Sequence, residues 1–340
     1  MNRMLGKQSM VFQTMPCVTG YGNVVGKKEK EGPLGELFDA AVEEEMAGGD
    51  NWEEAESNLQ VMAADMAVKR AGIARGDLRY LLAGDLLGQL IATSFGMKEF
   101  GVPLFGLYGA CSTMGEAASL GAVLVDGGYA DRVMALTSSH FASAEKQFRF
   151  PLGYGNQRPM SATWTVTGSA ALVIEDKKEK AKGDIWIKGI TTGKIVDYGI
   201  KDSMNMGAAM APAAADLIEN HLKDFGVAPE HYDRIITGDL GYVGKEILLD
   251  LLEQKGIDIS RCHMDCGIEI FDQKTQDTHA GGSGCACSGV TLTAYVFRKL
   301  KAGEWSRVLF VPTGALLSQV SFNEGQSVPG IAHGIIFESK

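Results

Sequence analysis

Apolar residues along the chain group into alternating helix-like and strand-like segments. Residues 58–72, NLQVMAADMAVKRAG, carry apolar positions at helical spacing, and a glycine closes the segment, as is common at helix ends. A continuous apolar run follows at residues 80–83 and is typical of a strand covered on both faces. The pattern therefore predicts an α/β protein with buried sheets.

The same arrangement occurs twice. Residues 71–86, AGIARGDLRYLLAGDL, and residues 225–240, FGVAPEHYDRIITGDL, both run from a helix end through a charged loop into a strand that closes on Gly-Asp-Leu. The helical segments at residues 111–128 and 286–303 then each lead into a further strand, VMALTSS and VLFVPTG. Two copies in one order predict a duplicated fold whose halves are related by a pseudo-two-fold axis.

The halves and their central helices can be placed along the chain. The charged stretch at residues 175–184 predicts a boundary that gives units at 1–178 and 179–340. The helices after Cys111 and after Gly284 are rich in glycine, alanine and serine. Because small residues let helix backbones approach closely, we expect these two helices to form a central layer between two sheets.

Composition excludes several classes of protein. The 340 residues are 45% hydrophobic, enough for a large core, and the net charge of −10 argues against a nucleic-acid partner. No apolar run reaches membrane-spanning length and no export signal is recognisable, so we expect a soluble protein. Six irregularly spaced cysteines indicate reduced thiols, and their spacing does not indicate a metal site. No nucleotide-binding motif follows a strand.

Cys111 is the first candidate functional residue. It lies in LYGACSTMGE, where the apolar run from Val102 to Leu107 turns into a helix. Free backbone N–H groups at a helix start stabilise a thiolate and an oxyanion, which suits a nucleophile or a ligand-contacting thiol. A small buried residue at a tight turn is the structural alternative. We expect Cys111 to line a pocket.

Two histidines could approach Cys111. His140 and its neighbour Ser139 end the strand-like run VMALTSSH, where the pocket is expected to open. A histidine there can bind a carboxylate or titrate near neutral pH, or a backbone carbonyl can hold it in a loop. His279 precedes the glycine-rich turn at residues 280–288 and is the second candidate.

Residues 141–163 are predicted to form a long polar insertion. Loops of this length in compact domains commonly carry function. Arg149 and Arg158, with Gln147, offer hydrogen-bond donors for a carboxylate ligand. For each of them, an ordinary surface position or a dimer contact is the alternative.

Several of these segments resemble a known superfamily. GACST at Cys111, WTVTGSAALVI at residues 164–174 and AGGSGCACS at residues 280–288 resemble the thiolase superfamily, which includes the ketoacyl synthases. Longer strings, including KKEKEGPLGELFD, NMGAAMAPAAAD and VPTGALLS, resemble the stage V sporulation protein AD family from about Met4 to Glu338. The resemblance implies a duplicated thiolase-like αβαβα layered fold.

The resemblance also exposes two departures. In catalytic members of the superfamily the matching cysteine is acylated, and decarboxylating condensing enzymes pair it with a histidine and an asparagine. The matching stretches here, residues 238–241 and 281–284, contain neither. Asp239 stands instead near the thiol, where an anion would raise the thiol pKa and repel an oxyanion. A helix cap, shared with the equivalent Asp85, is the structural alternative.

The family resemblance implies a binder of dipicolinic acid, alone or as its calcium chelate. It would belong to the SpoVA transport system, acting in uptake into the forming spore and in release at germination. The resemblance further implies a homodimer, peripheral association with the spore inner membrane through the other SpoVA proteins, and no cofactor of its own. The expected ligand-binding residues are Cys111, Ser139, His140, Arg149, Asp239 and His279.

Two competing predictions remain open at this point. One is an acyl-thioester condensing enzyme or a thiolase, with Cys111 as nucleophile and His140 or His279 as base. The missing histidine and asparagine disfavour this interpretation. The other is a structural subunit with an empty pocket.

Overall fold

The computed structural model describes residues 3–148, 157–177 and 181–339. The strands are β1 Met4–Leu5, β2 Ser9–Val11, β3 Cys17–Val25, β4 Ala40–Ala41, β5 Tyr80–Gly84, β6 Leu104–Gly106, β7 Arg132–Ser139, β8 Trp164–Thr165, β9 Gly168–Glu175, β10 Ile185–Thr192, β11 Arg234–Thr237, β12 His263–Asp265, β13 Gly282–Ser283, β14 Arg307–Val311, β15 Thr313–Ala315 and β16 Gly330–Glu338. The helices are α1 Lys27–Lys30, α2 Trp52–Ala71, α3 Ile91–Met97, α4 Thr113–Asp126, α5 Phe141–Phe148, α6 Met206–Phe225, α7 Gly241–Glu253, α8 Cys266–Glu269, α9 Cys285–Thr291, α10 Phe297–Lys301 and α11 Gln319–Asn323.

The strand order confirms the duplication. The main path runs β12-β11-β14-β16-β10-β3-β9-β7-β5-β6. On this path the first half contributes β3, β5, β6, β7 and β9, and the second half contributes β10, β11, β12, β14 and β16. When the five strands of each half are numbered 1 to 5 along the chain, both halves have the order 3-2-4-5-1 from the outer edge inward. In both halves the first three strands of this order pair in parallel, and the last two pairings are antiparallel. Strands β10 and β3 join the halves through two residue pairs, which places the pseudo-two-fold relation at the centre.

The predicted boundary between the halves falls in the connection from β9 to β10. Residues 178–180 of this connection lie outside the described residues. The division into units at 1–178 and 179–340 therefore stays a prediction.

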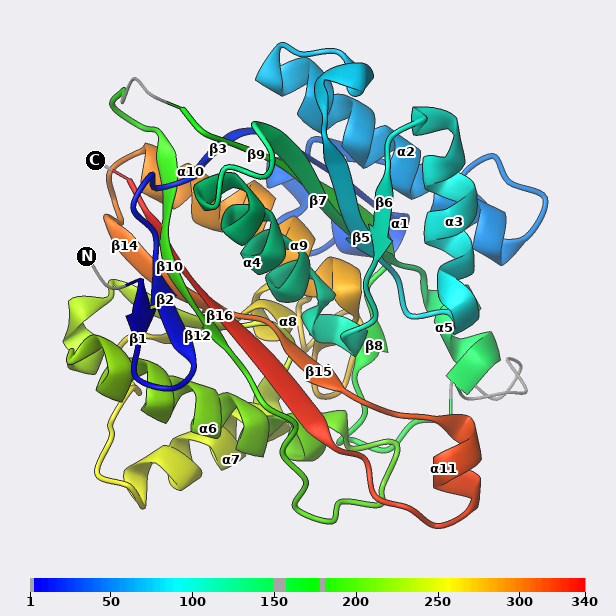
Figure 1. Cartoon of the computed structure of the whole chain (residues 1–340). Coiled ribbons are helices and arrows are strands. Elements are labelled where there is room, and N and C mark those ends of the chain that lie inside the picture. Colours follow the sequence, from blue (N-terminus) through cyan, green and yellow to red (C-terminus); the bar gives the residue numbers. More distant parts are fainter. Residues whose placement is uncertain (1–2, 149–156, 178–180, 340) are drawn as a thin grey trace.

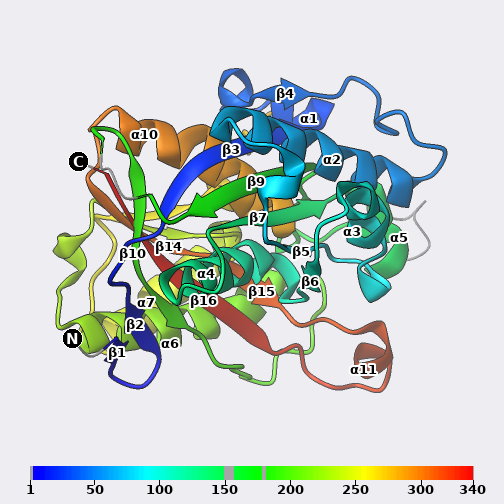
Figure 2. The same cartoon turned by 45° about the horizontal axis from the view of Figure 1, so that its top comes forward.

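Helices α4 and α9 form the expected central layer. Helix α4 contacts β5 and β7 of one half and β16 of the other, and it also contacts α9. Figure 1 shows α4 and α9 between the two sheet halves, with α2 on one outer side and α6 and α7 on the other. Figure 2 shows the same order of layers from a second direction. This is the αβαβα arrangement that the sequence pattern and the resemblance predicted.

Small residues make the central layer possible. A Cβ atom on Gly115 of α4 would lie 3.1 Å from side-chain atoms of His333 and Pro312. A Cβ atom on Gly289 of α9 would lie 3.0 Å from the methyl groups of Ala170 and Met114. Both distances are shorter than ordinary packing contacts, so larger side chains would push the layers apart.

Two predicted elements differ in the structure. The insertion expected at residues 141–163 is not a loop throughout, because α5 occupies Phe141–Phe148 and buries Ala142 and Ala144. The helix expected across residues 286–303 begins as α9, passes through a π-helical segment at Leu292–Val296 and ends as α10. Among the helices of the described residues, none is long and apolar enough to cross a membrane.

Replacing Gly115 with leucine tests the central layer. We expect Gly115→Leu to lower the free energy of unfolding by about 1–3 kcal/mol, because the new side chain overlaps Pro312 and His333. Urea unfolding measured by circular dichroism checks this value. Gly76→Ala is the control, since a Cβ at Gly76 meets no atom within 4 Å. Equal stability of both variants would contradict the close packing of α4.

Candidate functional site

Cys111 lies where the sequence predicted, at a turn from strand to helix. Strand β6 leads into a short 3-10 turn at Ala110–Ser112, and α4 begins at Thr113. Ala110 has a φ of 50°, a left-handed conformation that is uncommon for a residue with a Cβ. The Thr113 hydroxyl donates to the Ala110 carbonyl at 2.6 Å and closes the turn. This turn directs the Cys111 side chain, which is 6% exposed, into a cavity.

The cavity at Cys111 has a volume of about 280 Å³. Its lining combines apolar side chains with a few hydroxyl groups, and it is formed by Leu86, Tyr108, Ala110, Cys111, Ala144, Phe148, Thr165, Met206, Ser283, Gly284, Ala315, Leu316, Leu317 and Ser318. Within the described part of the chain, no charged side chain lines this cavity. The cavity therefore offers an apolar, partly aromatic wall with hydroxyl donors.

Asp239 lies behind the thiol and connects three segments. Its Oδ1 accepts a hydrogen bond from the Thr313 hydroxyl at 2.7 Å, and its Oδ2 accepts one from the Gly284 N–H at 3.1 Å. The carboxyl group is also hydrogen-bonded to the Cys111 thiol. Burial raises the pKa of Asp239 from 3.8 to about 7, against the lowering effect of these three partners.

The Cys111 thiol is held in its protonated form. Burial is the main cause that raises its pKa well above the usual value, and the charges of Asp239 and Cys285 raise it further. The stabilisation that a helix start gives to a thiolate is therefore outweighed by desolvation. An activated nucleophile needs the opposite shift of its pKa.

The equivalent aspartate of the first half has a different role. Asp85 accepts hydrogen bonds from the Leu87 and Thr93 N–H groups at 2.7 and 2.8 Å and from the Thr93 hydroxyl at 2.6 Å. It holds the loop that leads into α3, as the capping alternative predicted. Asp239 does not share this role.

His140 lies in the wall of a different cavity. Its Nδ1 accepts a hydrogen bond from the Ala142 N–H at 3.1 Å, so its Nε2 donates to the Glu45 carbonyl at 2.8 Å. Burial lowers the pKa of the ring, which is therefore neutral at pH 7. The prediction that His140 lies at the Cys111 pocket is corrected here. A backbone carbonyl holds the ring, as in the structural alternative, because the chain turns into α5 directly after His140.

Ser139 and His279 have structural partners. The Ser139 hydroxyl donates to the Val166 carbonyl at 2.7 Å and accepts from the Ala286 N–H at 3.1 Å in the first turn of α9. His279 is hydrogen-bonded through Nδ1 to the Pro159 carbonyl at 2.9 Å, and its Nε2 lies 3.0 Å from Asp277. Neither residue lines the Cys111 cavity.

The three hydrogen-bond donors predicted in the insertion at residues 141–163 differ in where they lie. Arg149 lies outside the described residues. Arg158 donates to the Asp277 carbonyl at 2.8 Å, and its guanidinium lies 4.7 Å from the centre of the Trp164 ring. Gln147 accepts a hydrogen bond from the Gly88 N–H at 2.9 Å. The structure therefore uses Arg158 and Gln147 to hold neighbouring loops.

Sequence reasoning missed most of the cavity wall. Phe148, Met206 and Leu317 come from three distant segments, and only the fold brings them together around Cys111. Tyr108 lies three residues before Cys111, so its nearness in the sequence was a usable signal. Its hydroxyl donates to the Leu86 carbonyl at 2.9 Å, and both residues line the cavity. Thr313, which holds Asp239, lies inside the quoted string VPTGALLS.

The cysteines form neither disulfides nor a metal cluster. All six are free thiols in the structure. Cys285 donates to the Ala110 carbonyl at 3.0 Å, and Cys287 contacts the Gly238 carbonyl at 3.4 Å. In residues 3–148, 157–177 and 181–339, no group of three or more His, Cys, Asp or Glu side chains is arranged to hold a metal ion.

The layered duplicated fold with a cysteine at this turn defines a protein of the thiolase-like class. Among solved structures, cerulenin-bound OleA from Xanthomonas campestris matches with a TM-score of 0.60 at 13% identity, covering 96% of this chain and 98% of that one. The 3-oxoacyl-[acyl-carrier-protein] synthase III of Aquifex aeolicus matches with a TM-score of 0.55 at 13% identity, covering 95% and 99%. Identities this low show the fold alone.

The sequence comparisons are more specific. The family model described as stage V sporulation protein AD (SpoVAD) matches residues 6–338. The stage V sporulation protein AD of Bacillus subtilis (strain 168) is 44% identical over 336 residues, covering 99% of this chain and 98% of that protein. The chain therefore belongs to the stage V sporulation protein AD family, a family of sporulation proteins. The ligand-binding roles of Cys111 and Asp239 stay predictions.

The raised pKa of Asp239 predicts a pH dependence of stability. An acid with a higher pKa in the folded than in the unfolded state binds its proton more tightly when folded, so its contribution is lost as the pH rises from 3.8 through about 7. We expect wild-type stability to fall over this interval, relative to Asp239→Asn, by about 4 kcal/mol at most. Urea unfolding at a series of pH values measures the difference. The exposed Asp131→Asn is the control and should keep the wild-type slope; an identical slope in Asp239→Asn would contradict the raised pKa.

Proposed function

We propose that this protein binds dipicolinic acid in the Cys111 cavity. In this role it serves the SpoVA transport system, in uptake into the forming spore and in release at germination. The observation that carries the proposal is that the cavity of a thiolase-like fold persists while its cysteine is protonated and hydrogen-bonded to Asp239. Membership of the stage V sporulation protein AD family supports the sporulation role.

The cavity wall suits the shape of this ligand. Dipicolinic acid is a flat pyridine ring with two carboxylates. Tyr108 and Phe148 provide aromatic surface for the ring, and Thr165, Ser283 and Ser318 provide hydroxyl groups for carboxylate oxygens.

The lack of charged side chains in the described wall favours a neutral ligand. A free dianion would lose its hydration against a wall in which the described residues carry no charge, and this loss is costly. The one-to-one calcium chelate is neutral and brings its own cation, so it enters the cavity at a lower cost. We therefore propose the calcium chelate as the form that this cavity binds more tightly.

Titration calorimetry with dipicolinic acid, with and without calcium, tests the proposal. We expect saturable binding that calcium strengthens, and a loss of about tenfold in Phe148→Ala because the aromatic wall is removed. The exposed Phe95→Ala, outside the cavity, is the matched control and should bind like the wild type. Intact mass after incubation with an acyl-coenzyme A should show no adduct.

Two results would overturn the proposal. Weaker binding in His140→Ala with unchanged binding in Phe148→Ala would move the ligand to the cavity that His140 lines. A stoichiometric acyl adduct that disappears in Cys111→Ala, without dipicolinic acid binding, would favour the condensing enzyme or thiolase.

We further propose that the protein is a homodimer, peripheral to the spore inner membrane and docked on the other SpoVA proteins. The edge strand β6 supports the dimer. Among the described strands it pairs only with β5, and its Leu104 and Phe105 are 42% and 48% exposed. An apolar edge strand of this kind favours pairing with the same strand of a second copy.

A charged residue introduced into β6 tests the dimer. We expect Phe105→Lys to shift the protein to the monomer, because a buried ammonium at the shared edge lacks a partner. Sedimentation velocity at micromolar concentration measures the mass. Tyr198→Lys, at an exposed residue in the connection between β10 and α6, should leave the dimer intact. A wild-type protein that sediments as a monomer would contradict this part of the proposal.

A further inference from the structure

Helix α5 forms part of the walls of two cavities. Its Ala144 and Phe148 line the Cys111 cavity. Its first residue lines a second cavity, of about 490 Å³, whose wall also contains Glu29. The groups that hold α5 in place therefore also hold the wall of the Cys111 cavity.

A buried chain of hydrogen bonds runs from the loop after β5 to α2. Gln60 of α2 is its middle member, and its amide donates to the Thr93 hydroxyl at 3.0 Å and to the Ser138 hydroxyl at 2.7 Å. The Thr93 hydroxyl donates to Asp85 at 2.6 Å. The Ser138 hydroxyl donates to Glu56 Oε1 at 2.7 Å. Two buried carboxyl groups, Asp85 and Glu56, therefore lie in one hydrogen-bonded network.

Glu56 extends this chain to α5. Its Oε2 lies 2.7 Å from the Ser143 hydroxyl oxygen, which also lies 3.0 Å from the His140 carbonyl. The Ser143 hydroxyl has one hydrogen, so it donates to one of these two oxygens at a time. When Glu56 is protonated, its O–H donates to Ser143, and Ser143 donates to the His140 carbonyl at the start of α5. When Glu56 is ionised, Ser143 turns its hydrogen to the carboxylate and the carbonyl loses this donor.

The chain adjoins the wall of the Cys111 cavity at two places. Asp85 directly precedes Leu86, and Ser143 directly precedes Ala144. Leu86 and Ala144 both line the cavity. The chain therefore ties two segments of the cavity wall together from behind.

One proton of this network is held on Glu56. Burial raises the pKa of both carboxyl groups, but Asp85 accepts three hydrogen bonds, two of them from backbone N–H groups, which favour its ionised form. Glu56 accepts hydrogen bonds from two hydroxyls, and no ammonium or guanidinium group of the described chain pairs with it. Burial, with the charge of Asp85, raises the pKa of Glu56 from 4.5 to about 8.

The titratable groups on the neighbouring helices do not offset a charge on Glu56. Glu53 of α2 raises the pKa of Glu56 further, and the Lys146 ammonium of α5 is paired with Glu53 at 2.9 Å. Glu145 of α5 is another buried carboxyl group. Burial holds Cys285 of α9 in its thiol form. Ionisation of Glu56 therefore adds a negative charge to a buried region that already contains a carboxylate.

The other elements packed against α2 carry little charge. Helix α3 contains no charged residue. The strands β3, β7 and β9 carry charge only at Arg132 and Glu175, which pair with each other at 2.6 Å. These elements provide no cation for Glu56.

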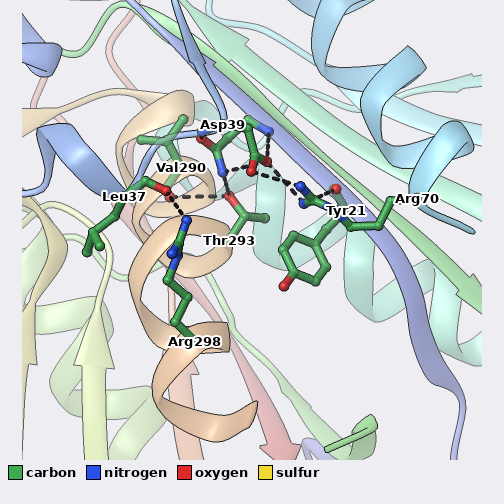
Figure 3. A network of polar contacts seen from close by, with 8 residues as sticks. Tyr21, Leu37, Asp39, Arg70, Val290, Thr293 and Arg298 are labelled. Carbon is green, nitrogen blue, oxygen red and sulfur yellow. Dashed lines mark hydrogen bonds and ion pairs between the residues drawn. The ribbon is translucent and has the colours of Figure 1, made fainter. Parts of the chain in front are cut away.

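The opposite end of α2 is fixed. Arg70 donates to both oxygens of the Asp39 carboxylate, at 2.8 and 3.1 Å, and to the Tyr21 carbonyl at 2.6 Å. Figure 3 shows Arg70 reaching from its helix into this network. Helix α2 spans 20 residues, whereas α5 has eight. A repulsion at Glu56 therefore displaces α5 more readily than α2.

We propose that the proton on Glu56 keeps α5 in position and that loss of this proton loosens the wall of the Cys111 cavity. The two carboxylates then repel each other within one buried network, and the Leu86 and Ala144 segments move apart. A group whose pKa is raised by folding loses its stabilising contribution as the pH rises, here through about 8. The weakening of ligand binding that follows rests on the proposed function, whereas the movement of α5 does not.

Hydrogen exchange followed by mass spectrometry tests the movement without a ligand. We expect the protection of residues 141–148, corrected for the intrinsic exchange rate, to fall about tenfold from pH 7 to pH 9 in the wild type. Glu56→Gln keeps a neutral donor to Ser143 at both pH values, so its protection should stay constant. Asp65→Asn is the matched control and should show the wild-type fall, because Asp65 is an exposed carboxylate of the same helix.

Ser143→Ala provides a second variant. It removes a hydrogen bond that favours the ionised form of Glu56, so the fall in protection should move to higher pH. This shift decides the matter if Glu56→Gln fails to fold, as judged by circular dichroism. A loss of packing alone would lower the protection without moving its pH dependence.

Titration calorimetry with calcium dipicolinate tests the effect on binding. We expect the ratio of wild-type to Glu56→Gln affinity to fall about fivefold from pH 7 to pH 9. Asp239 titrates in both proteins, so this ratio isolates Glu56. Constant protection of α5 in the wild type, or an equal fall in Glu56→Gln, would overturn the proposal. A constant affinity ratio would overturn the link to the cavity. pH-dependent protection without any binding would support the role of Glu56 and overturn the proposed function.

Discussion

The close approach of helices α4 and α9 is the constraint on which the rest of the structure depends. Both helices lie inside the molecule, and α4 touches sheet strands of both halves. Glycines at positions 115 and 289 leave room only for backbone and small groups at these contacts. The turns that precede the two helices consequently meet, and this brings Cys111 next to Gly284 in the wall of one cavity. A larger residue in either helix would separate the two turns and open the site.

The loss of hydration on burial sets the pKa values of Cys111 and Asp239, where the two turns meet. A helix start favours a thiolate, but Cys111 is buried beside Asp239, and the cost of burying charge is larger. The same burial raises the pKa of Asp239 to about 7. The thiol is therefore protonated at pH 7, Asp239 is near the midpoint of its titration there, and its two oxygens accept hydrogen bonds from Thr313 and Gly284. The result is a cavity without charged side chains among its described lining residues, on a fold that OleA and the 3-oxoacyl-[acyl-carrier-protein] synthase III share.

The walls of the two cavities differ in the number of charged side chains. The wall at Cys111 is apolar with hydroxyl groups, whereas the wall at Glu29 holds carboxylates, ammonium groups and aromatic rings. His140 lies in the wall of the second although it follows the strand β7, because α5 begins directly after it and turns its ring toward Trp52. Helix α5 thus contributes to both cavities, with Ala144 and Phe148 at one and Phe141 at the other.

The sequence by itself determined the duplicated α/β fold, the central helices and the place of Cys111, because periodicity, repeated segments and small residues are local properties of the chain. It also indicated that Asp239 opposes an anionic thiol. Only the tertiary structure decided which residues surround the thiol, since Phe148, Met206 and Leu317 are far apart in sequence and meet through packing. It likewise separated His140 and His279 from Cys111, because their ring nitrogens bond backbone carbonyls that no sequence pattern places beside them.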